Sequence, residues 1–244
     1  MEKSKENKIK WIFFKNRLKN VYRTGWLELG VEKDQVESVA DHIASTSSLI
    51  NSYNEQYDLK LDINKVDKML LMKEIVKAYT KEEKSVINGE NTNEINRNII
   101  IQICKDYNLD SSYLTIYDEY IKQETSEAKY SLMFSKFESD LQAVDYYERG
   151  LITLDSVLKD IEFYPEELKN NVKSMLEKYP IPPLAWLTYD RKYYKDNELL
   201  TSLSDSLIEY CINQYKKDNS IINEKNMEVK LKWSLQLVHH QMII

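Results

Sequence analysis

The distribution of proline is the feature that most constrains the fold of this chain. The sequence has 244 residues with only four prolines and four glycines, and every proline lies after residue 160. Proline breaks helices because its ring removes an amide donor and clashes with the preceding turn. The first two thirds of the chain lack this breaker, so the sequence predicts an all-α protein.

Apolar residues recur at helical spacing along most of the chain, and no segment alternates as a strand would. Ser38 followed by Asp41 resembles a capping box, and Asp110, Ser111 and Ser112 offer N-cap side chains for a later helix. The helices predicted from this spacing cover 8–23, 38–55, 62–79, 92–107, 111–122, 126–149, 165–178, 193–216 and 222–242.

Two segments divide these helices. Glu82–Asn93 is polar and contains Gly89, so we expect a loop there. Lys178–Pro183 carries three prolines and cannot be helical throughout. We therefore expect a helical domain over residues 1–164 and a C-terminal helical extension over residues 165–244.

Composition excludes several classes of protein. The chain has 42% hydrophobic residues, but no apolar run approaches the roughly 18 residues of a membrane helix, and its lysine-rich start lacks the apolar stretch of a signal peptide. We expect a cytoplasmic protein without a membrane partner. A net charge of −6 argues against a nucleic acid polymer as partner. Cys104 and Cys211 stand apart from other Cys and His, which predicts buried or half-buried thiols.

Residues 1–23 are a local exception, because their basic residues are interleaved with apolar ones. A basic amphipathic helix can lie on a membrane or on nucleic acid. In a globular chain it more often packs its apolar side on the core. We expect packing on the core here.

The spacing of the second helix places His42 on the same face as Val39 and Ile50, so this imidazole is expected to point inward. A lone inward histidine is more often a hydrogen-bonded core residue than a ligand. On the third helix, Lys73 and Lys77 lie on the apolar face. Because burying an unpaired ammonium is expensive, these side chains either extend to solvent or meet a carboxylate, a phosphate or another anion.

Three segments carry a resemblance to a known family. They are Leu18–Trp26 with Gly30, Val31 and Glu37–His42; Met72–Glu82; and Thr125–Ala128 with Phe137, Glu138 and Gln142–Tyr146. Together they resemble the HD-domain superfamily, and within it the 5'-deoxynucleotidase-like branch of metal-dependent phosphohydrolases. The resemblance spans roughly residues 10–150 and implies an HD-domain helical bundle.

The resemblance also implies a divalent metal held by a His, by an adjacent His-Asp pair and by a final Asp. At these positions the chain has His42, then Lys73 and Glu74, and finally Ser135. An ammonium has no lone pair for a metal, and a serine hydroxyl poorly replaces an anionic oxygen. Only His42 and Glu74 remain as residual metal ligands, so we expect no metal cofactor.

Two further positions support this interpretation. Lys77 stands where the resemblance implies a glutamate, and Lys81-Glu82 stands where it implies Gly-Asp. His239 and His240 offer no substitute, because adjacent residues on a helix point in different directions.

The substrate side of the implied pocket is kept. Arg23 and Trp26 match family positions near the nucleotide, where a guanidinium can bind phosphate and an indole can supply an apolar wall. The alternative is that Trp26 anchors the core and Arg23 is a structural cation. With Lys73 or Lys77 in the metal position, the leading expectation is a pseudoenzyme that binds a nucleotide or another phosphate without hydrolysing it.

Two other functions stay open. One is an active metal-dependent 5'-deoxynucleotidase or related phosphohydrolase with an altered site, which would use Mn, Co, Fe or Mg. The other is a scaffold or regulatory subunit whose C-terminal helices bind a protein partner, because aromatic residues are enriched at interfaces. The alternative, which we favour for these aromatics, is ordinary helix packing. Relatives are often homodimers, so we expect a homo-oligomer. The aromatic residues of the C-terminal region that favour the scaffold function are Trp186, Tyr189, Tyr193, Tyr194 and Trp233.

Overall fold

A computed structural model describes the backbone of residues 2–80, 92–163 and 165–241, and their side chains apart from those of 2–4, 163 and 220–241. Within these ranges the all-α prediction is confirmed. The one extended pairing among the described residues is an isolated antiparallel bridge between Tyr22 and Ser38.

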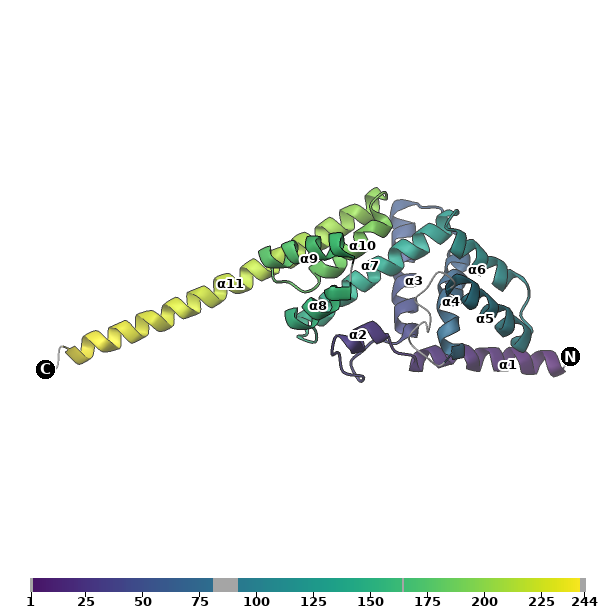
Figure 1. Ribbon diagram of the computed structural model, residues 1–244, viewed down its shortest axis with the longest axis horizontal. Coiled ribbons are helices and arrows are strands. Elements are labelled where there is room, and N and C mark those ends of the chain that lie inside the picture. Colours follow the sequence, from purple (N-terminus) through teal and green to yellow (C-terminus); the bar gives the residue numbers. More distant parts are fainter. Residues whose placement is uncertain (1, 81–91, 164, 242–244) are drawn as a thin grey trace.

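The helices follow one another along the chain with short connections where the structure describes them (Figure 1). Their bounds are α1 (Glu2–Asn16), the 3-10 helix η1 (Arg17–Asn20), α2 (Thr24–Glu28), α3 (Val39–Tyr57), α4 (Ile63–Thr80), α5 (Thr92–Tyr107), α6 (Ser112–Lys122), α7 (Ser126–Glu148), α8 (Leu154–Asp160), the 3-10 helix η2 (Ile161–Phe163), α9 (Glu166–Lys178), α10 (Leu184–Tyr194) and α11 (Glu198–Gln241).

Helix α7 lies at the centre of the fold and positions the site. It packs against α3, α4, α6, α10 and α11 (Figure 1). Because neighbours cover it on several sides, α7 buries polar as well as apolar side chains. A buried polar side chain is costly unless it has a hydrogen-bond partner. Ser135, Glu138 and Ser139 have such partners, whereas Ser131 Oγ and Asp140 Oδ1 have none among the described residues. The buried polar residues are Ser131, Ser135, Glu138, Ser139 and Asp140.

Helix α3 begins at the predicted capping box. The Ser38 Oγ accepts from the Asp41 amide at 3.2 Å, and the Asp41 carboxylate accepts from the Ser38 amide at 2.9 Å. The predicted inward face is confirmed, since Val39, His42 and Ile50 are no more than 2% exposed. The cap therefore fixes the start of α3, and the helical spacing then turns His42 toward α7.

The cap of α6 differs in detail from the expectation. Asp110 supplies it, because its Oδ1 accepts from the Ser112 amide at 2.8 Å. Ser111 occupies the N-cap position but makes no capping hydrogen bond with its side chain.

The basic N-terminal segment packs on the core, as predicted. Trp11 and Phe14 are buried and cluster with apolar residues of α4 and α5. The prediction of one helix over 8–23 is wrong at its end, because α1 stops at Asn16 and η1 continues only to Asn20. The chain turns there so that its next residues can pair with the segment before α3.

The spacing predicts no helix at α2, α8 or α10. Thr153 starts α8, because its side chain accepts from the Ser156 amide. Pro183 occupies the N-cap of α10. A proline is tolerated at the start of a helix because the first amides have no partner within the helix.

The prediction of two last helices, over 193–216 and 222–242, is wrong. Helix α11 is continuous from Glu198 to Gln241, and Figure 1 shows it extending beyond the other helices. The segment 217–221 between the two predicted helices contains no proline or glycine that would end a helix.

One hydrophobic cluster connects the two parts of the predicted domain division. It contains Trp26 of α2 and Val144 of α7, together with Val172 of α9, Leu184 of α10 and Cys211 of α11. The division of the chain at residue 165 stays a prediction, although apolar packing crosses it.

Both cysteines are free, with Cys104 half-buried and Cys211 buried, as predicted. No helix in the described residues is both long and apolar enough to span a membrane.

The aromatic residues of α10 have intramolecular contacts. Tyr194 is 1% exposed, and the Lys136 ammonium lies 4.5 Å from the centroid of the Tyr193 ring. The side chain of Trp233 lies outside the described residues. A partner surface on the C-terminal helices therefore stays a prediction, as does the homodimer.

Candidate functional site

Helices α3, α4 and α7, together with the segment that leads into α2, enclose a polar cavity of about 310 Å³. We call it the polar cavity. Its wall brings together the sequence-predicted site residues other than Trp26, which lies at a neighbouring cavity. The lining residues are Tyr22, Arg23, Thr24, Gly25, His42, Lys73, Glu74, Lys77, Ser135, Lys136 and Ser139.

His42 lies between two side chains of α7. Its Nδ1 contacts the Glu138 carboxylate, and its Nε2 lies 3.0 Å from the Ser135 Oγ. Ser135 and Glu138 share a face of α7 because they are three residues apart. The imidazole is 2% exposed and satisfied at both nitrogens. His42 therefore has the environment of a hydrogen-bonded core residue, which the sequence offered as the alternative to a metal-ligating histidine.

The two inward lysines of α4 meet a carboxylate from their own helix. Lys73 Nζ lies 3.1 Å from Glu74 Oε1, and Lys77 Nζ lies 2.6 Å from Glu74 Oε2. Lys73 also donates to the Ser135 Oγ at 2.6 Å. Glu74 is thus the anion that the sequence required for these cations. The sequence left a carboxylate, a phosphate or another anion open as the partner of these lysines, and the structure shows a carboxylate.

Burial and neighbouring charges shift ionisation in the site. Burial, reinforced by nearby cations, holds the pKa of His42 well below its usual range. Burial acts to raise the pKa of Glu74, but the ammonium groups of Lys77 and Lys73 outweigh it and hold this pKa well below its usual range. Burial raises the pKa of Glu138 to about 8. The site therefore combines a neutral imidazole with an ionised Glu74.

Arg23 and Trp26 both contact Glu37. The Trp26 indole is 3% exposed and donates to Glu37 Oε1 at 2.8 Å, while Arg23 Nε lies 3.6 Å from the same oxygen. Arg23 Nη2 also donates to the Ser139 Oγ at 2.9 Å. Burial raises the pKa of Glu37, although Arg23 and Trp26 act to lower it. Trp26 thus has the packing of a core anchor, and ligand contact by either residue stays a prediction.

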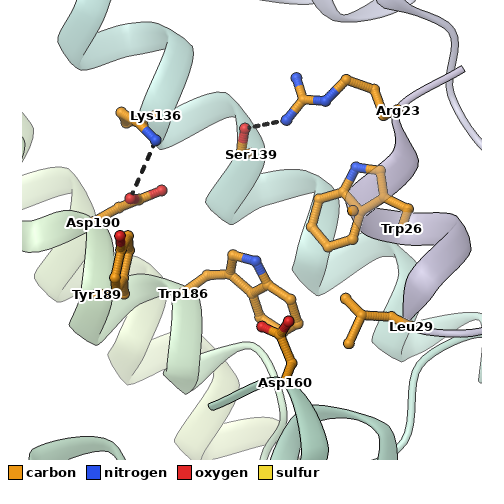
Figure 2. Close-up of a pocket in the computed structure, with 10 residues that line it drawn as sticks. Arg23, Trp26, Leu29, Lys136, Ser139, Asp160, Trp186, Tyr189 and Asp190 are labelled. Carbon is orange, nitrogen blue, oxygen red and sulfur yellow. Dashed lines mark hydrogen bonds and ion pairs between the residues drawn. The ribbon is translucent and has the colours of Figure 1, made fainter. Parts of the chain in front are cut away.

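A second cavity of about 220 Å³ adjoins the first, and we call it the aromatic cavity. Figure 2 shows Trp26 and Trp186 on its walls, with Asp160 and Leu29 beside them and the Lys136–Asp190 ion pair at another edge. The two cavities share four lining residues, which are Arg23, Gly25, Lys136 and Ser139. A ligand with a charged end and a planar apolar end could therefore contact both.

Sequence reasoning missed Glu37 and Glu138 as site residues. With His42 they form a buried group whose potential metal-binding atoms all lie within 4.8 Å of one another. A local signal existed for Glu138, since it lies three residues after Ser135 and therefore on the same face of a helix. For Glu37, the signal was its place in the segment that leads to His42.

Comparison with known proteins identifies the family. The sequence matches the profile of the HD domain over residues 15–175. The chain belongs to the HD domain family. The match starts before η1 and ends within α9, so it includes all residues that line the polar cavity. No curated protein matches the sequence.

Solved structures support the fold of this HD domain. The PH0347 protein from Pyrococcus horikoshii OT3 is 21% identical with a TM-score of 0.52, over 81% of this chain and 98% of that one. A predicted metal-dependent phosphohydrolase from Magnetospirillum magnetotacticum MS-1 is 16% identical with a TM-score of 0.50, over 86% of this chain and 94% of that one. At these identities the likeness concerns the fold alone.

The residues at the implied metal positions of this HD domain do not fit a divalent ion. His42 Nε2 faces Ser135, and Glu74 is paired with two ammonium groups. Lys73 places a positive charge 2.6 Å from the oxygen that would have to replace a carboxylate ligand. Ligands must carry free lone pairs to hold a metal. Lys81 and Glu82 lie outside the described residues, as do the side chains of His239 and His240.

Proposed function

We propose that this HD domain is a pseudoenzyme of the phosphohydrolase fold that binds a nucleotide or another phosphate-bearing ligand without using a metal. The observation that carries the proposal is the position of Lys73, whose ammonium contacts both Ser135 and Glu74 at implied metal-ligand positions. A fixed cation at this point repels a divalent ion and attracts an anion. A binding or regulatory role follows, because metal-assisted hydrolysis needs the ion.

The charge of the polar cavity supports an anionic ligand. Four cationic side chains line it, and the acidic residue that lines it is Glu74. The cationic residues are Arg23, Lys73, Lys77 and Lys136. Arg and Lys groups form charge-assisted hydrogen bonds with phosphate, and Arg can do so in a bidentate manner.

The aromatic cavity supports a nucleotide over inorganic phosphate. Trp186 and Tyr189 are half-buried on its wall, and planar rings offer stacking surface to a base. Arg23 and Lys136 line both cavities, so a phosphate between them would leave a base within the aromatic cavity.

Isothermal titration of the full chain with nucleoside monophosphates and with inorganic phosphate, in the presence of a chelator, tests the proposal. We expect saturable binding that Arg23→Gln and Lys77→Gln each weaken about tenfold, as loss of a charge-assisted hydrogen bond does. Lys68→Gln is the matched control, because Lys68 is an exposed lysine of the same helix as Lys77. Absence of binding to the folded protein would refute the proposal.

A second candidate function rests on the buried group of Glu37, His42 and Glu138. Nitrogen and carboxylate donors suit Zn, Mn or Fe. A bound ion would polarise a phosphoryl oxygen or lower the pKa of a bound water. The protein would then be a phosphohydrolase with an altered metal site, shifted from the implied one.

Metal analysis distinguishes the two candidates. The altered-site hydrolase requires stoichiometric metal that Glu37→Gln and Glu138→Gln remove, and release of phosphate from nucleoside monophosphates that depends on this metal. Glu28→Gln is the matched control, because Glu28 lies outside the metal-binding group. Metal that survives both glutamine substitutions would exclude the altered site.

A further inference from the structure

Glu138, His42 and Ser135 lie in a row, and the proposed binding function assigns no chemical step to them. The Glu138 carboxylate contacts Nδ1 of the imidazole, and Nε2 lies 3.0 Å from the Ser135 Oγ. A carboxylate, an imidazole and a hydroxyl in this order form the triad arrangement of serine hydrolases, which is recognised by its geometry and not by sequence position. Ser135 also lines the polar cavity, so a bound molecule can reach it.

Hydrogen-bond accounting favours one proton arrangement in this row. Lys73 Nζ has no acceptor lone pair, so it must donate to Ser135 Oγ, 2.6 Å away. When Glu138 is ionised, above its raised pKa of about 8, the Ser135 hydroxyl can donate to His42 Nε2, while Nδ1 carries the ring proton and donates to Glu138. Every group then has a partner. The opposite tautomer would direct two donors at Ser135 Oγ, so neither His42 nor Lys73 could accept the proton of this hydroxyl.

We propose that Ser135 is a nucleophile, with His42 as its general base, and that the polar cavity cleaves carboxylic esters that carry a phosphate or carboxylate group. Glu138 is a positioning residue, because it orients the imidazole through Nδ1. The Lys73 ammonium lies 2.6 Å from Ser135 Oγ, beside the place where the carbonyl oxygen of an attacked ester would carry the developing negative charge, so Lys73 is the residue proposed to stabilise that charge.

The chemical step balances without a metal or a redox partner. Ser135 Oγ forms a bond to the ester carbonyl carbon while its proton passes to His42 Nε2. The carbon–oxygen bond to the alcohol then breaks, and the alcohol leaves with that proton. Water attacks the acyl-serine, gives its proton to Nε2, and the carboxylic acid leaves as Ser135 regains a proton.

The preference for an anionic ester follows from the other residues of the cavity. Lys77 and Arg23 lie on the wall with Lys73, so a substrate with a negative group gains electrostatic attraction that a neutral ester lacks. This inference goes beyond the proposed function and does not depend on it. A small neutral probe can react with Ser135 whether or not phosphate binds.

Labelling of the full chain by an alkyl fluorophosphonate tests the proposal. Reaction joins the serine Oγ to phosphorus and releases fluoride, and peptide mass spectrometry identifies the labelled residue. We expect the label on Ser135, in the presence of a chelator. Ser131→Ala is the matched control, because Ser131 is another buried serine of α7 that does not line the cavity. It should label at the wild-type rate, whereas Ser135→Ala should not label.

The role of His42 needs a readout that a packing defect would not give. We expect His42→Ala to slow labelling about 100-fold, the usual effect of losing a general base. Added imidazole should recover about tenfold of that loss by occupying the vacated space. Circular dichroism confirms that the variant is folded.

The same experiment can overturn the proposal. If folded wild-type protein leaves Ser135 unlabelled, or takes the label on Ser139 instead, Ser135 is not an activated nucleophile. Equal labelling of the wild type and of folded His42→Ala would show that His42 is not its base. If His42→Ala fails to fold, wild-type labelling still decides whether Ser135 is activated, and the comparison for His42 is made with His42→Gln, which fills more of the space of the imidazole.

Discussion

The Nζ of Lys73 lies 2.6 Å from the Oγ of Ser135, and the same oxygen lies 3.0 Å from Nε2 of His42. Ser135 thus contacts two of the other three implied metal-ligand positions of the HD domain directly. At the fourth, Glu74 pairs with Lys73 at 3.1 Å. Hydrogen bonds and ion pairs thus connect the four positions.

The first prediction concerns the ion triad of Lys73, Glu74 and Lys77. Removing both cations in a Lys73→Met, Lys77→Met double variant leaves the buried Glu74 carboxylate without a partner. We expect the free energy of unfolding to fall by about 3 kcal/mol, because an unpaired buried charge is strongly destabilising. Urea denaturation measures this change.

The matched test adds Glu74→Met to that double variant. Replacing a buried ion network by apolar side chains of similar size is often neutral or stabilising. We expect the triple variant to recover most of the lost stability. A triple variant no more stable than the double would show that the cations do not compensate Glu74.

The second prediction concerns the pH dependence of stability from Glu74. Its pKa in the folded protein lies well below the ordinary 4.5, held there by Lys77 and Lys73 against the opposing effect of burial. The stabilisation is therefore fully present above about pH 4.5 and is lost as the pH falls through the folded pKa. The stability difference between wild type and Glu74→Gln should be constant near neutral pH and shrink in acid. Denaturation at a series of pH values measures it, and a difference that grows in acid would contradict this assignment.

The third prediction concerns Asp140 on α7. Burial and the neighbouring Asp190 hold the pKa of Asp140 well above the ordinary 3.8. The folded state therefore binds more protons than the unfolded state above about pH 3.8, so this group makes stability fall as the pH rises. We expect the stability of Asp140→Asn, relative to that of the wild type, to increase as the pH rises. The asparagine keeps an oxygen that can accept from the Tyr194 hydroxyl, which lies 2.7 Å from the Asp140 carboxylate. Asp145→Asn, which changes an exposed carboxylate on the same helix, is the matched control.

The fourth prediction concerns the Trp26 indole. Trp26→Phe keeps much of the ring packing against Tyr146 and Trp186 but removes the donor to Glu37. We expect a loss of about 1–3 kcal/mol, the cost of leaving a buried polar group with one partner fewer. Thermal or urea unfolding checks it. Restored stability in Trp26→Phe combined with Glu37→Gln would identify the lost hydrogen bond as the cause.

Local sequence signals predicted much of this fold for identifiable reasons. The Ser38–Asp41 capping box set the start of α3, and helical spacing then placed His42 inward. The need of Lys73 and Lys77 for an anion also followed from spacing alone. These signals act within a few residues, so one sequence is enough to find them.

The missed features depend on longer-range contacts. Glu138 meets His42 across 96 positions of sequence, and no periodicity specifies which helices approach each other. The ion pairs of Glu74 with Lys73 and Lys77 depend on side-chain rotamers, which a sequence does not specify; its role as a residual metal ligand stays a prediction. The continuous α11 and the start of α10 after Pro183 show that boundaries are weakly encoded when the expected breaker is absent or stands at a cap.

The metal content of the purified chain after incubation with Mn²⁺ and dialysis tests the central claim most directly. We expect the wild type to retain no stoichiometric metal. A variant with Lys73→His, Glu74→Asp, Lys77→Glu and Ser135→Asp, which restores the implied ligands, should retain close to one equivalent. Close to one equivalent of tightly bound metal in the wild type would contradict the claim that Lys73 has replaced the metal.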